Sequence, residues 1–429
     1  MDGVDTPSKK AAPEENGTGV VDIAAKNGDL VLQIEHATDL PNSTVHSFRV
    51  STTALKAKSK YFERLLESGR FGEGHQIATQ HDALKQKFQN LSLAPTEDLP
   101  AIRIKDLGRI SAVKSIRPLL TDFLLMLHDK DTQATPPVSN LANLAIVSDR
   151  FDALEAARTH VRRKKLLKAL DAKTQPKQDS SLPEERVRQR LLVALLLDYP
   201  PWVDKYSARL IAKGWVGQEA DLEDPLWWDL PNRMEEELAL RRASVLSTIQ
   251  SMQAHFLALY ASRTRQCRLG YDTSPECDSF QFGEMVRFFL RAGTLKLQNT
   301  IVPEEEQEGE GAANGKSGPS PLPSYEGDIP LLLDRLKQIP EYQVDRNHSH
   351  CGIRTRLVPF ADLIASAALQ AGVCGECWAE DRHAHSWLGL KRPLKWRRQA
   401  DGVVLRGQEH ARRHASVRDF FLAGEKDWA

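Results

Sequence analysis

The sequence predicts an α+β protein in which a small β-sheet with a cluster of helices is followed by a mostly α-helical region. Two observations predict this class. Short apolar runs of the kind that form strands lie within the first 105 residues, whereas later apolar residues recur at the three- and four-residue spacing of helices. The chain has 429 residues, of which 41% are hydrophobic and 27% charged, so it is long and apolar enough for two or three buried cores.

The first predicted ordered block covers residues 28–170 and begins with a β-hairpin. Residues 29–34 and 46–50 have the pattern of strands, and a Pro-Asn-Ser turn separates them. Ser51 is a predicted helix N-cap, and Ser59 is predicted to start a second helix after a short break. The stretch from Gly74 to Asp98 is polar and looks like an insertion. A further strand and three helices complete the block, at residues 101–104, 116–127, 140–151 and 154–170.

Several motifs in this block follow one another in a fixed order. The hairpin carries Asp29-Leu30-Val31-Leu32 and Phe48-Arg49-Val50, and the helical stretch after it carries Leu55, Ser59, Tyr61 and Phe62. The strand at Ile102-x-Ile104 and the helical patterns at 119–127 and 143–149 come next. Over about 140 residues these motifs resemble the BTB/POZ domain family. The resemblance implies a BTB/POZ fold that self-associates or holds a protein partner. The alternative is an unrelated α+β domain with the same order of elements.

The resemblance also implies three protein-binding residues. In BTB domains of transcriptional repressors, a strand Asp and a basic residue form a charged pocket. This chain has Asp29, but Ser51 and Thr52 stand where the family usually has a His and often a basic residue. Phe71-Gly72-Glu73 resembles the hydrophobic-x-Glu motif by which many BTB domains engage a cullin scaffold, with Phe71 as apolar anchor and Glu73 as charged contact. The alternative is an ordinary loop with a half-buried Phe71.

The rest of the sequence divides by composition. Residues 1–27 are predicted to be a disordered tail, and residues 301–324 a disordered acidic and Pro-rich linker. Residues 182–300 and 325–429 are predicted to be helical. One spacing of 4, 3, 4 and 3 residues favours a core-facing stripe over a coiled-coil seam, and it consists of Val245, Ile249, Met252, Phe256 and Leu259.

A cluster of potential metal ligands lies near the C-terminal end. Three of the five cysteines and four of the thirteen histidines fall within 38 residues. The Cys374-x2-Cys377 turn can supply two thiolates to a zinc ion, which needs two further nitrogen or sulfur ligands. We predict Cys351 and His350 as those ligands. His348, His383 and His385 are alternatives. Two alternatives involve no metal. The cysteines are then either a reduced pair beside solvated histidines or a redox-active pair. Cys267 and Cys277 are predicted to lie in a polar loop with no third ligand nearby.

A basic stretch follows this cluster. Residues 391–398 contain five Lys or Arg residues, and Arg406, Arg412, Arg413 and Arg418 come after them. The 58 basic residues of the chain balance its 58 acidic residues, so an anionic partner would engage this stretch rather than the whole surface. The stretch is typical of a nuclear-import signal or a nucleic-acid contact, in which Trp396 could stack on a base, or of a solvated face.

The function expected from these features is non-enzymatic protein binding through a BTB/POZ domain. Within this class, the first option that the resemblance implies is a substrate adaptor of a cullin-type ubiquitin ligase. The alternative is a nuclear transcriptional regulator whose C-terminal region binds zinc or nucleic acid. The sequence contains no nucleophile elbow, phosphate-binding loop, dinucleotide fingerprint or His-Glu-x2-His motif. The longest apolar run, Leu191–Leu197, is far shorter than the roughly 20 residues that cross a bilayer. The few cysteines and the lack of a signal peptide indicate an intracellular protein of the nucleus or cytoplasm.

Overall fold

The protein is mixed α+β and mostly helical, which confirms this part of the predicted class. The computed structural model describes residues 21–36, 44–111, 116–132, 135–217, 220–221, 223–268, 274–295, 325–391, 393–397 and 410–428. The chain forms two compact units. The N-terminal unit contains Met1–Asp179 and Glu223–Leu226, and the C-terminal unit contains Ser180–Leu222 and Trp227–Ala429. None of the described helices is long and apolar enough to cross a membrane.

A four-stranded sheet forms the base of the N-terminal unit, with strand order β1-β3-β2-β4. The predicted hairpin is confirmed, because β2 (Leu30–His36) pairs antiparallel with β3 (Thr44–Val50). The predicted third strand is β4 (Ala101–Ile104), which pairs parallel with β2. Strand β1 (Val21–Ile23) pairs parallel with β3, although the sequence predicted a disordered tail up to residue 27. Residues 1–20 of that tail lie outside the described residues.

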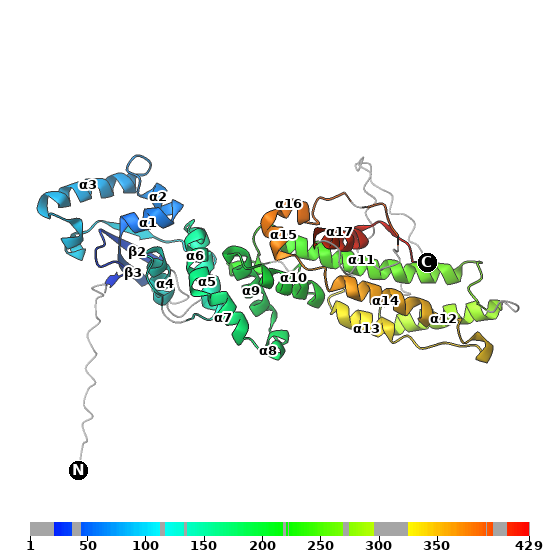
Figure 1. Cartoon of the computed structure of the whole chain (residues 1–429). Coiled ribbons are helices and arrows are strands. Elements are labelled where there is room, and N and C mark those ends of the chain that lie inside the picture. Colours follow the sequence, from blue (N-terminus) through cyan, green and yellow to red (C-terminus); the bar gives the residue numbers. More distant parts are fainter. Residues whose placement is uncertain are drawn as a thin grey trace, which may run out of the picture. The chain divides into compact units, whose positions relative to one another are not determined.

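Helices pack around this sheet (Figure 1). The alternation of the strands puts Leu32, Phe48 and Ile102 into the core, where each is nearly inaccessible. The helices of the unit are α1 (Thr52–Lys58), α2 (Lys60–Leu65), α3 (Gly72–Lys87), α4 (Arg117–Leu127), α5 (Val138–Arg150), α6 (Leu154–Lys164) and α7 (Leu166–Lys173), with 3-10 turns η1 (Leu91–Leu93) and η2 (Thr96–Asp98). Helix α8 (Pro176–Ser180) spans the sequence boundary between the two units.

The predicted break between α1 and α2 is confirmed at Ser59. This residue ends α1 and also caps α2, because its hydroxyl accepts a hydrogen bond from the Phe62 amide at 3.1 Å. The same hydroxyl donates to the Phe151 carbonyl at 2.6 Å. The Phe62 and Phe151 rings stack with centroids 5.3 Å apart. One buried serine therefore fixes both the bend between the two helices and their contact with the end of α5.

The first part of the polar stretch from Gly74 to Asp98, which looks like an insertion in the sequence, lies in a regular helix. Helix α3 has 16 residues and buries only Gly74, Ile77 and Leu84. Leu84 belongs to a small apolar cluster with Val31 of β2 and Leu99. Since so few of its residues are apolar, the sequence carries almost no helical periodicity there.

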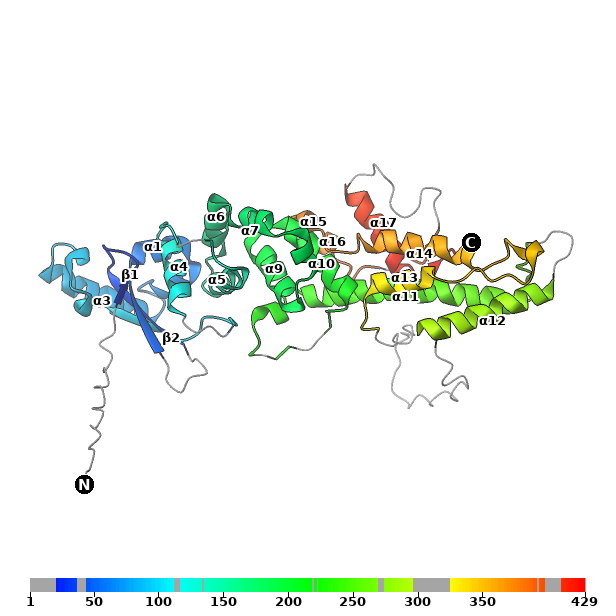
Figure 2. The same cartoon turned by 90° about the horizontal axis from the view of Figure 1, so that it is seen from below.

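The C-terminal unit is helical and is arranged along the 28-residue helix α11 (Met234–Ala261) (Figures 1 and 2). Its other helices are α9 (Glu184–Leu197), α10 (Pro200–Lys213), α12 (Pro275–Ala292), α13 (Ile329–Lys337), α14 (Arg354–Ala368), α15 (Gly375–Glu380), α16 (Arg382–His385) and α17 (His410–Leu422). The short elements are η3 (Leu226–Trp228), η4 (Arg346–His348) and the parallel pair β5 (Lys395–Trp396) and β6 (Glu425–Lys426).

The predicted stripe on α11 faces the core. Val245, Met252 and Phe256 are buried in one apolar cluster, to which α14 contributes Leu357 and α17 contributes Phe420. The residues predicted as two separate helical blocks, 182–300 and 325–429, therefore lie in one unit apart from Glu223–Leu226, and helices from both blocks share one core. The predicted linker at 301–324 lies outside the described residues.

Candidate metal centres

All five cysteines of the chain gather with three histidines in two groups within the C-terminal unit. Within each group, the sulfur and nitrogen atoms that can bind a metal all lie within 4.8 Å of one another. Site 1 consists of Cys267, Cys277, His348 and Cys351, and site 2 consists of Cys374, Cys377, His410 and His414.

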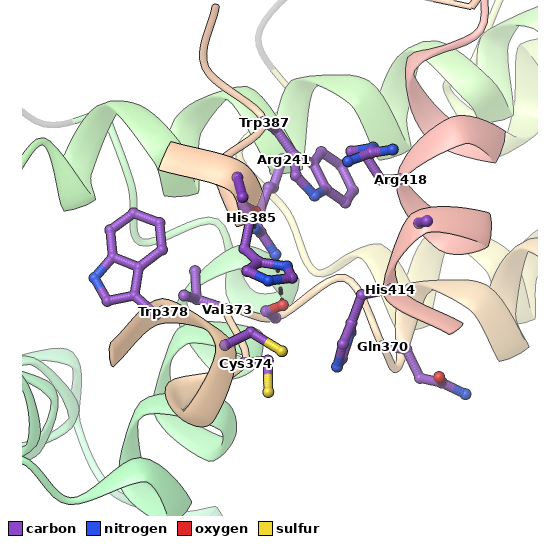
Figure 3. A pocket seen from close by; sticks show the side chains of 13 residues that line it. Arg241, Gln370, Val373, Cys374, Trp378, His385, Trp387, His414 and Arg418 are labelled. Atoms are coloured by element: carbon purple, nitrogen blue, oxygen red, sulfur yellow. Dashed lines mark hydrogen bonds between the residues drawn. The ribbon is translucent and has the colours of Figure 1, made fainter. Parts of the chain in front are cut away.

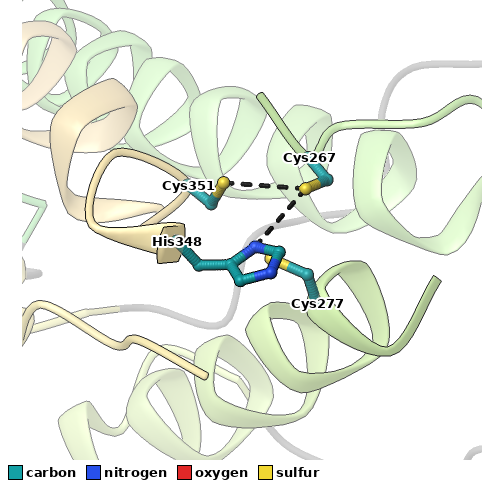
Figure 4. A group of neighbouring side chains, drawn as sticks. All are labelled: Cys267, Cys277, His348 and Cys351. Atoms are coloured by element: carbon teal, nitrogen blue, oxygen red, sulfur yellow. Dashed lines mark hydrogen bonds between the residues drawn. The ribbon is translucent and has the colours of Figure 1, made fainter. Parts of the chain in front are cut away.

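Site 1 is built from three separate segments (Figure 4). Cys267 lies in the loop after α11, and Cys277 lies in the first turn of α12. The Ser274 hydroxyl caps that turn by accepting from the Cys277 amide at 3.3 Å. His348 and Cys351 lie at the tight turn η4 that precedes α14. The side chains of Cys277, His348 and Cys351 are buried, so the group is closed to solvent on most sides.

The atoms of site 1 point toward a common centre. The Cys267 sulfur lies 3.7 Å from the Cys351 sulfur and 3.5 Å from Nδ1 of His348. All of these cysteines are free thiols. The Arg268 amide donates to the Cys351 sulfur at 3.3 Å, and an Asp345 carboxylate oxygen lies 4.0 Å from Nε2 of His348. Each ring nitrogen of His348 thus faces a polar group, Nδ1 the Cys267 sulfur and Nε2 the Asp345 carboxylate.

Burial favours the neutral form of the Cys277 thiol in site 1. Burial raises the pKa of the Cys277 thiol strongly, and the nearby Cys351 and Cys267 thiols raise it further. A thiol that stays protonated at neutral pH is a poor nucleophile. Site 1 is therefore better suited to binding a cation than to nucleophilic chemistry. A bound cation would stabilise several thiolates at once.

Site 2 joins two helices of the C-terminal unit. Cys374 is the N-cap of α15, and Cys377 lies in its first turn. His410 and His414 begin α17 and are four residues apart, which places both rings on the same face of that helix. The Cys374 sulfur lies 3.2 Å from Nε2 of His410, which lies 3.1 Å from Nε2 of His414. Cys377 is buried, whereas His410 is exposed.

His414 and Cys377 of site 2 favour their neutral forms. Burial, followed by the neighbouring His410, lowers the pKa of His414 to about 4. Burial, followed by the Cys374 thiol, raises the pKa of Cys377 to about 12. A neutral imidazole is the form of histidine that binds a metal. Imidazole and thiol groups held this close can therefore serve as one ligand set.

A network of buried hydrogen bonds supports the turn that carries Cys374. Arg241 of α11 is paired with Glu237 at 2.7 Å and donates to the carbonyls of Ala371 and His385 at 3.1 and 3.3 Å. The Glu237 carboxylate also accepts from the Trp387 amide at 2.9 Å. A small cavity of about 100 Å³ lies beside the site, lined in part by Arg241, His385 and Trp387 (Figure 3). The chain before and after the Cys-x2-Cys turn is thus fixed to α11.

Steric contact explains why the Cys-x2-Cys turn contains a glycine at position 375. A Cβ atom at Gly375 would lie 2.5 Å from the Cα of Pro200, so only glycine fits at this approach of α15 to α10. Asp204 of α10 accepts a hydrogen bond from the Gly375 amide. Burial raises the pKa of Asp204, and this hydrogen bond opposes the rise. The close approach of Gly375 to Pro200 and the hydrogen bond to Asp204 therefore hold the backbone of the turn against α10.

The structure distributes the four predicted metal ligands over different places. Cys351 belongs to site 1, Cys374 and Cys377 belong to site 2, and His350 is exposed and belongs to neither. Cys351 and Cys374 stay apart because α14 begins at Arg354, and its 15 residues advance by roughly 22 Å toward Cys374.

Sequence reasoning missed Cys267, Cys277, His410 and His414 as members of these groups. Cys277 is not in a polar loop but in α12, where its side chain is fully buried. The four-residue spacing of His410 and His414 was a usable signal, because it places two rings on one helix face. Cys267 carried no such signal, since it meets Cys351 across 84 residues of sequence.

The predicted protein-binding residues lie in the N-terminal unit. The Asp29 carboxylate accepts hydrogen bonds from the amide and hydroxyl of Thr52 at 2.7 and 2.6 Å, and so it connects the start of β2 to α1. Phe71 is the N-cap of α3 and is 50% exposed. Glu73 is exposed in the first turn of the same helix. Phe71 thus stands at the start of a regular helix, with its ring on the surface.

The ring of Trp396 is already occupied by intramolecular contacts. It packs against Phe420 and Trp428, with ring centroids 4.7 and 6.3 Å away. Among the described residues of the basic stretch, Lys391, Lys395, Arg397 and Arg412 are exposed. Arg392, Arg398 and Arg406 lie outside the described residues. Base stacking by Trp396 would require this aromatic cluster to open.

Comparisons with known proteins give no match. No family model matches the sequence. Neither the curated proteins nor the solved structures contain a match to the chain.

Proposed function

We propose that the chain is a non-enzymatic protein-binding protein whose N-terminal unit is a BTB/POZ-type module. The motifs quoted above support this proposal, as does the hairpin that leads directly into two short helices separated at Ser59. The module would act by self-association or by holding a partner. Within this class, a substrate adaptor for a cullin-type ubiquitin ligase is the most specific candidate.

The observation that carries the proposal is the exposure of Phe71. Large aromatic side chains are usually buried, and one that is half exposed at a helix terminus can serve as an anchor for a partner. Glu73 follows two residues later on the same helix turn and offers a charge to a basic partner. Because Glu73 lies in the helix and Phe71 is its N-cap, little conformational entropy is lost when a partner binds them.

The test is co-purification of the full-length chain with cullin from cell extract. Replacing Phe71 and Glu73 together by Ala should reduce cullin recovery at least tenfold, because the anchor and the charge are both lost. Leu93→Ala is the matched control, since Leu93 is 71% exposed in the same unit. Equal recovery by the wild type and the double variant would exclude the cullin adaptor. Light scattering that gives a strict monomer would exclude self-association.

A second candidate is a nuclear regulator whose C-terminal unit binds nucleic acid. The exposed cations of Lys391, Lys395 and Arg397 favour it, because adjacent positive charges attract phosphate groups. Fluorescence anisotropy with a DNA duplex tests this candidate. Binding should weaken steeply as salt rises and should decrease when the three residues are replaced by Ala. Anisotropy that does not change at low salt would exclude the candidate.

A further inference from the structure

We propose that the C-terminal unit binds two zinc ions, one at site 1 and one at site 2, each held by four side chains of this chain. This inference concerns a different unit from the protein-binding proposal and does not depend on it. The ions would have a structural role, because each site already supplies the four ligands that zinc takes in closed sites.

The distances within site 1 fit a tetrahedral zinc ion. Zinc–sulfur bonds of about 2.3 Å and zinc–nitrogen bonds of about 2.0–2.1 Å place tetrahedral ligand atoms about 3.8 Å apart for two sulfurs and about 3.5 Å apart for sulfur and nitrogen. The Cys267 sulfur lies 3.7 Å from the Cys351 sulfur and 3.5 Å from Nδ1 of His348. A disulfide would require the two sulfurs to approach to about 2.05 Å.

Site 2 fits the same ion after a small adjustment. Its sulfur–nitrogen and nitrogen–nitrogen distances are 3.2 and 3.1 Å. Tetrahedral zinc requires about 3.5 and about 3.4 Å, so the ligand atoms must separate by about 0.3 Å. The side chains of His410 and His414 are exposed or half-buried, which leaves them free to make this movement.

The ligand types select zinc among the common metal ions. Site 1 offers three sulfurs and one nitrogen, and site 2 offers two of each. Magnesium and calcium prefer oxygen ligands, whereas tetrahedral sets of sulfur and nitrogen are typical of zinc. Neither set includes a carboxylate, and neither leaves a position for water in a four-coordinate ion. A catalytic zinc keeps such a position open, so the sets indicate structural ions.

The groups around site 1 match those that commonly surround bound zinc. Ligating histidines usually direct their other ring nitrogen to a carboxylate or carbonyl group. With Nδ1 of His348 toward the site, its Nε2 lies 4.0 Å from Asp345. The Asp345 carboxylate is itself fixed, because it accepts from the Asn347 amide at 2.8 Å. The Arg268 amide donates to the Cys351 sulfur and would stabilise a thiolate there.

The two ions would connect segments that are distant in sequence. Site 1 would join the end of α11, the start of α12 and the turn before α14, across 84 residues. Site 2 would join α15 to α17 across 36 residues. Because the four ligands of each site come together only in the folded chain, the free energy of metal binding would stabilise the folded unit while the cysteines stay reduced.

Metal analysis of the purified full-length chain tests the proposal. Elemental analysis should give two zinc ions per chain for the wild type. Cys351→Ser and Cys374→Ser should each leave one, and the double variant should leave none. His350→Ala and His383→Ala are matched controls that should retain two. Fewer than about 0.2 zinc per chain in the wild type would overturn the proposal. It would also be overturned by a single zinc that either cysteine variant removes, since that would indicate one shared site.

Two further measurements keep the proposal testable if a cysteine variant does not fold. His410→Ala alters an exposed side chain and should remove only the ion of site 2, so retention of both ions would contradict the ligand assignment. Cobalt(II) substituted into the wild-type chain should give the intense visible absorption of four-coordinate cobalt, with sulfur-to-metal charge transfer. The weak bands of six-coordinate cobalt would exclude both tetrahedral sites.

Discussion

Removing the Arg241 side chain is the sharpest test of how the C-terminal unit is held together. Arg241→Ala would leave the Glu237 carboxylate, which is 0% exposed, without its cation, and would remove the donors to the Ala371 and His385 carbonyls. Breaking one side of a buried ion pair costs about 3–5 kcal/mol. Because Glu237 still accepts from Ser386 and Trp387, we expect a loss near the lower limit, about 3 kcal/mol.

Tryptophan fluorescence during urea unfolding measures this loss directly. All eight tryptophans lie in the C-terminal unit, so the signal reports on that unit alone. With a slope of about 3 kcal/mol per M, the midpoint should fall by about 1 M urea. Arg287→Ala is the control, because its ion pair with Glu284 has a 73% exposed arginine and should contribute less than about 1 kcal/mol. If the two variants unfold at the same midpoint, the buried network does not stabilise the unit.

Three further predictions concern other parts of the molecule. Ser59→Ala should destabilise the N-terminal unit by about 1–2 kcal/mol, because it removes a helix cap and leaves the Phe151 carbonyl without a donor. Chemical unfolding followed by circular dichroism measures this loss, and Thr79→Ala, at an exposed residue, is the control. Burial lowers the pKa of His128, whose Nε2 accepts from the Ser51 amide, so the unfolded chain binds more protons at acid pH. The stability of the N-terminal unit should therefore be complete above about pH 6.5 and should decrease as pH falls below it. His128→Ala should reduce this dependence, and an unchanged pH profile would refute the assignment. A chelator should remove the ion of site 2 before that of site 1, because His410 is exposed whereas three ligands of site 1 are buried. A time course of metal content measures this order, and simultaneous loss of both ions would contradict it.

The sequence predicted those parts of the fold in which apolar periodicity was strong. The alternating strands at 29–34, 46–50 and 101–104 are present, and the stripe from Val245 to Phe256 is buried. Helix α3 was not predicted because only three of its 16 residues are buried, so its sequence resembles that of a polar loop. The change in composition after residue 300 predicts a boundary between two helical blocks, but helices on both sides of it share one core.

The candidate metal ligands were predicted only in part, for a geometric reason. Clustering within 38 residues of sequence favoured one site, whereas α14 separates Cys351 from Cys374 in space. The missing partners come from the loop after α11 and from helices α12 and α17, and only the three-dimensional packing of these segments brings them together. Local spacing predicts pairs of ligands on one turn or one helix face, but it does not predict which pairs meet.

The shared core of the C-terminal unit has a consequence for synthesis of the protein. Phe256 on α11 packs in a cluster with Phe360 of α14 and Phe420 of α17, which the ribosome adds much later. At the usual rates of translation, roughly 10–30 s pass between the synthesis of α11 and that of the last helix that covers its apolar face. During that time the nascent chain exposes the apolar face of a 28-residue helix, which is the type of surface that chaperones recognise. We therefore expect the yield of folded protein in a cell-free translation system to depend on added chaperones.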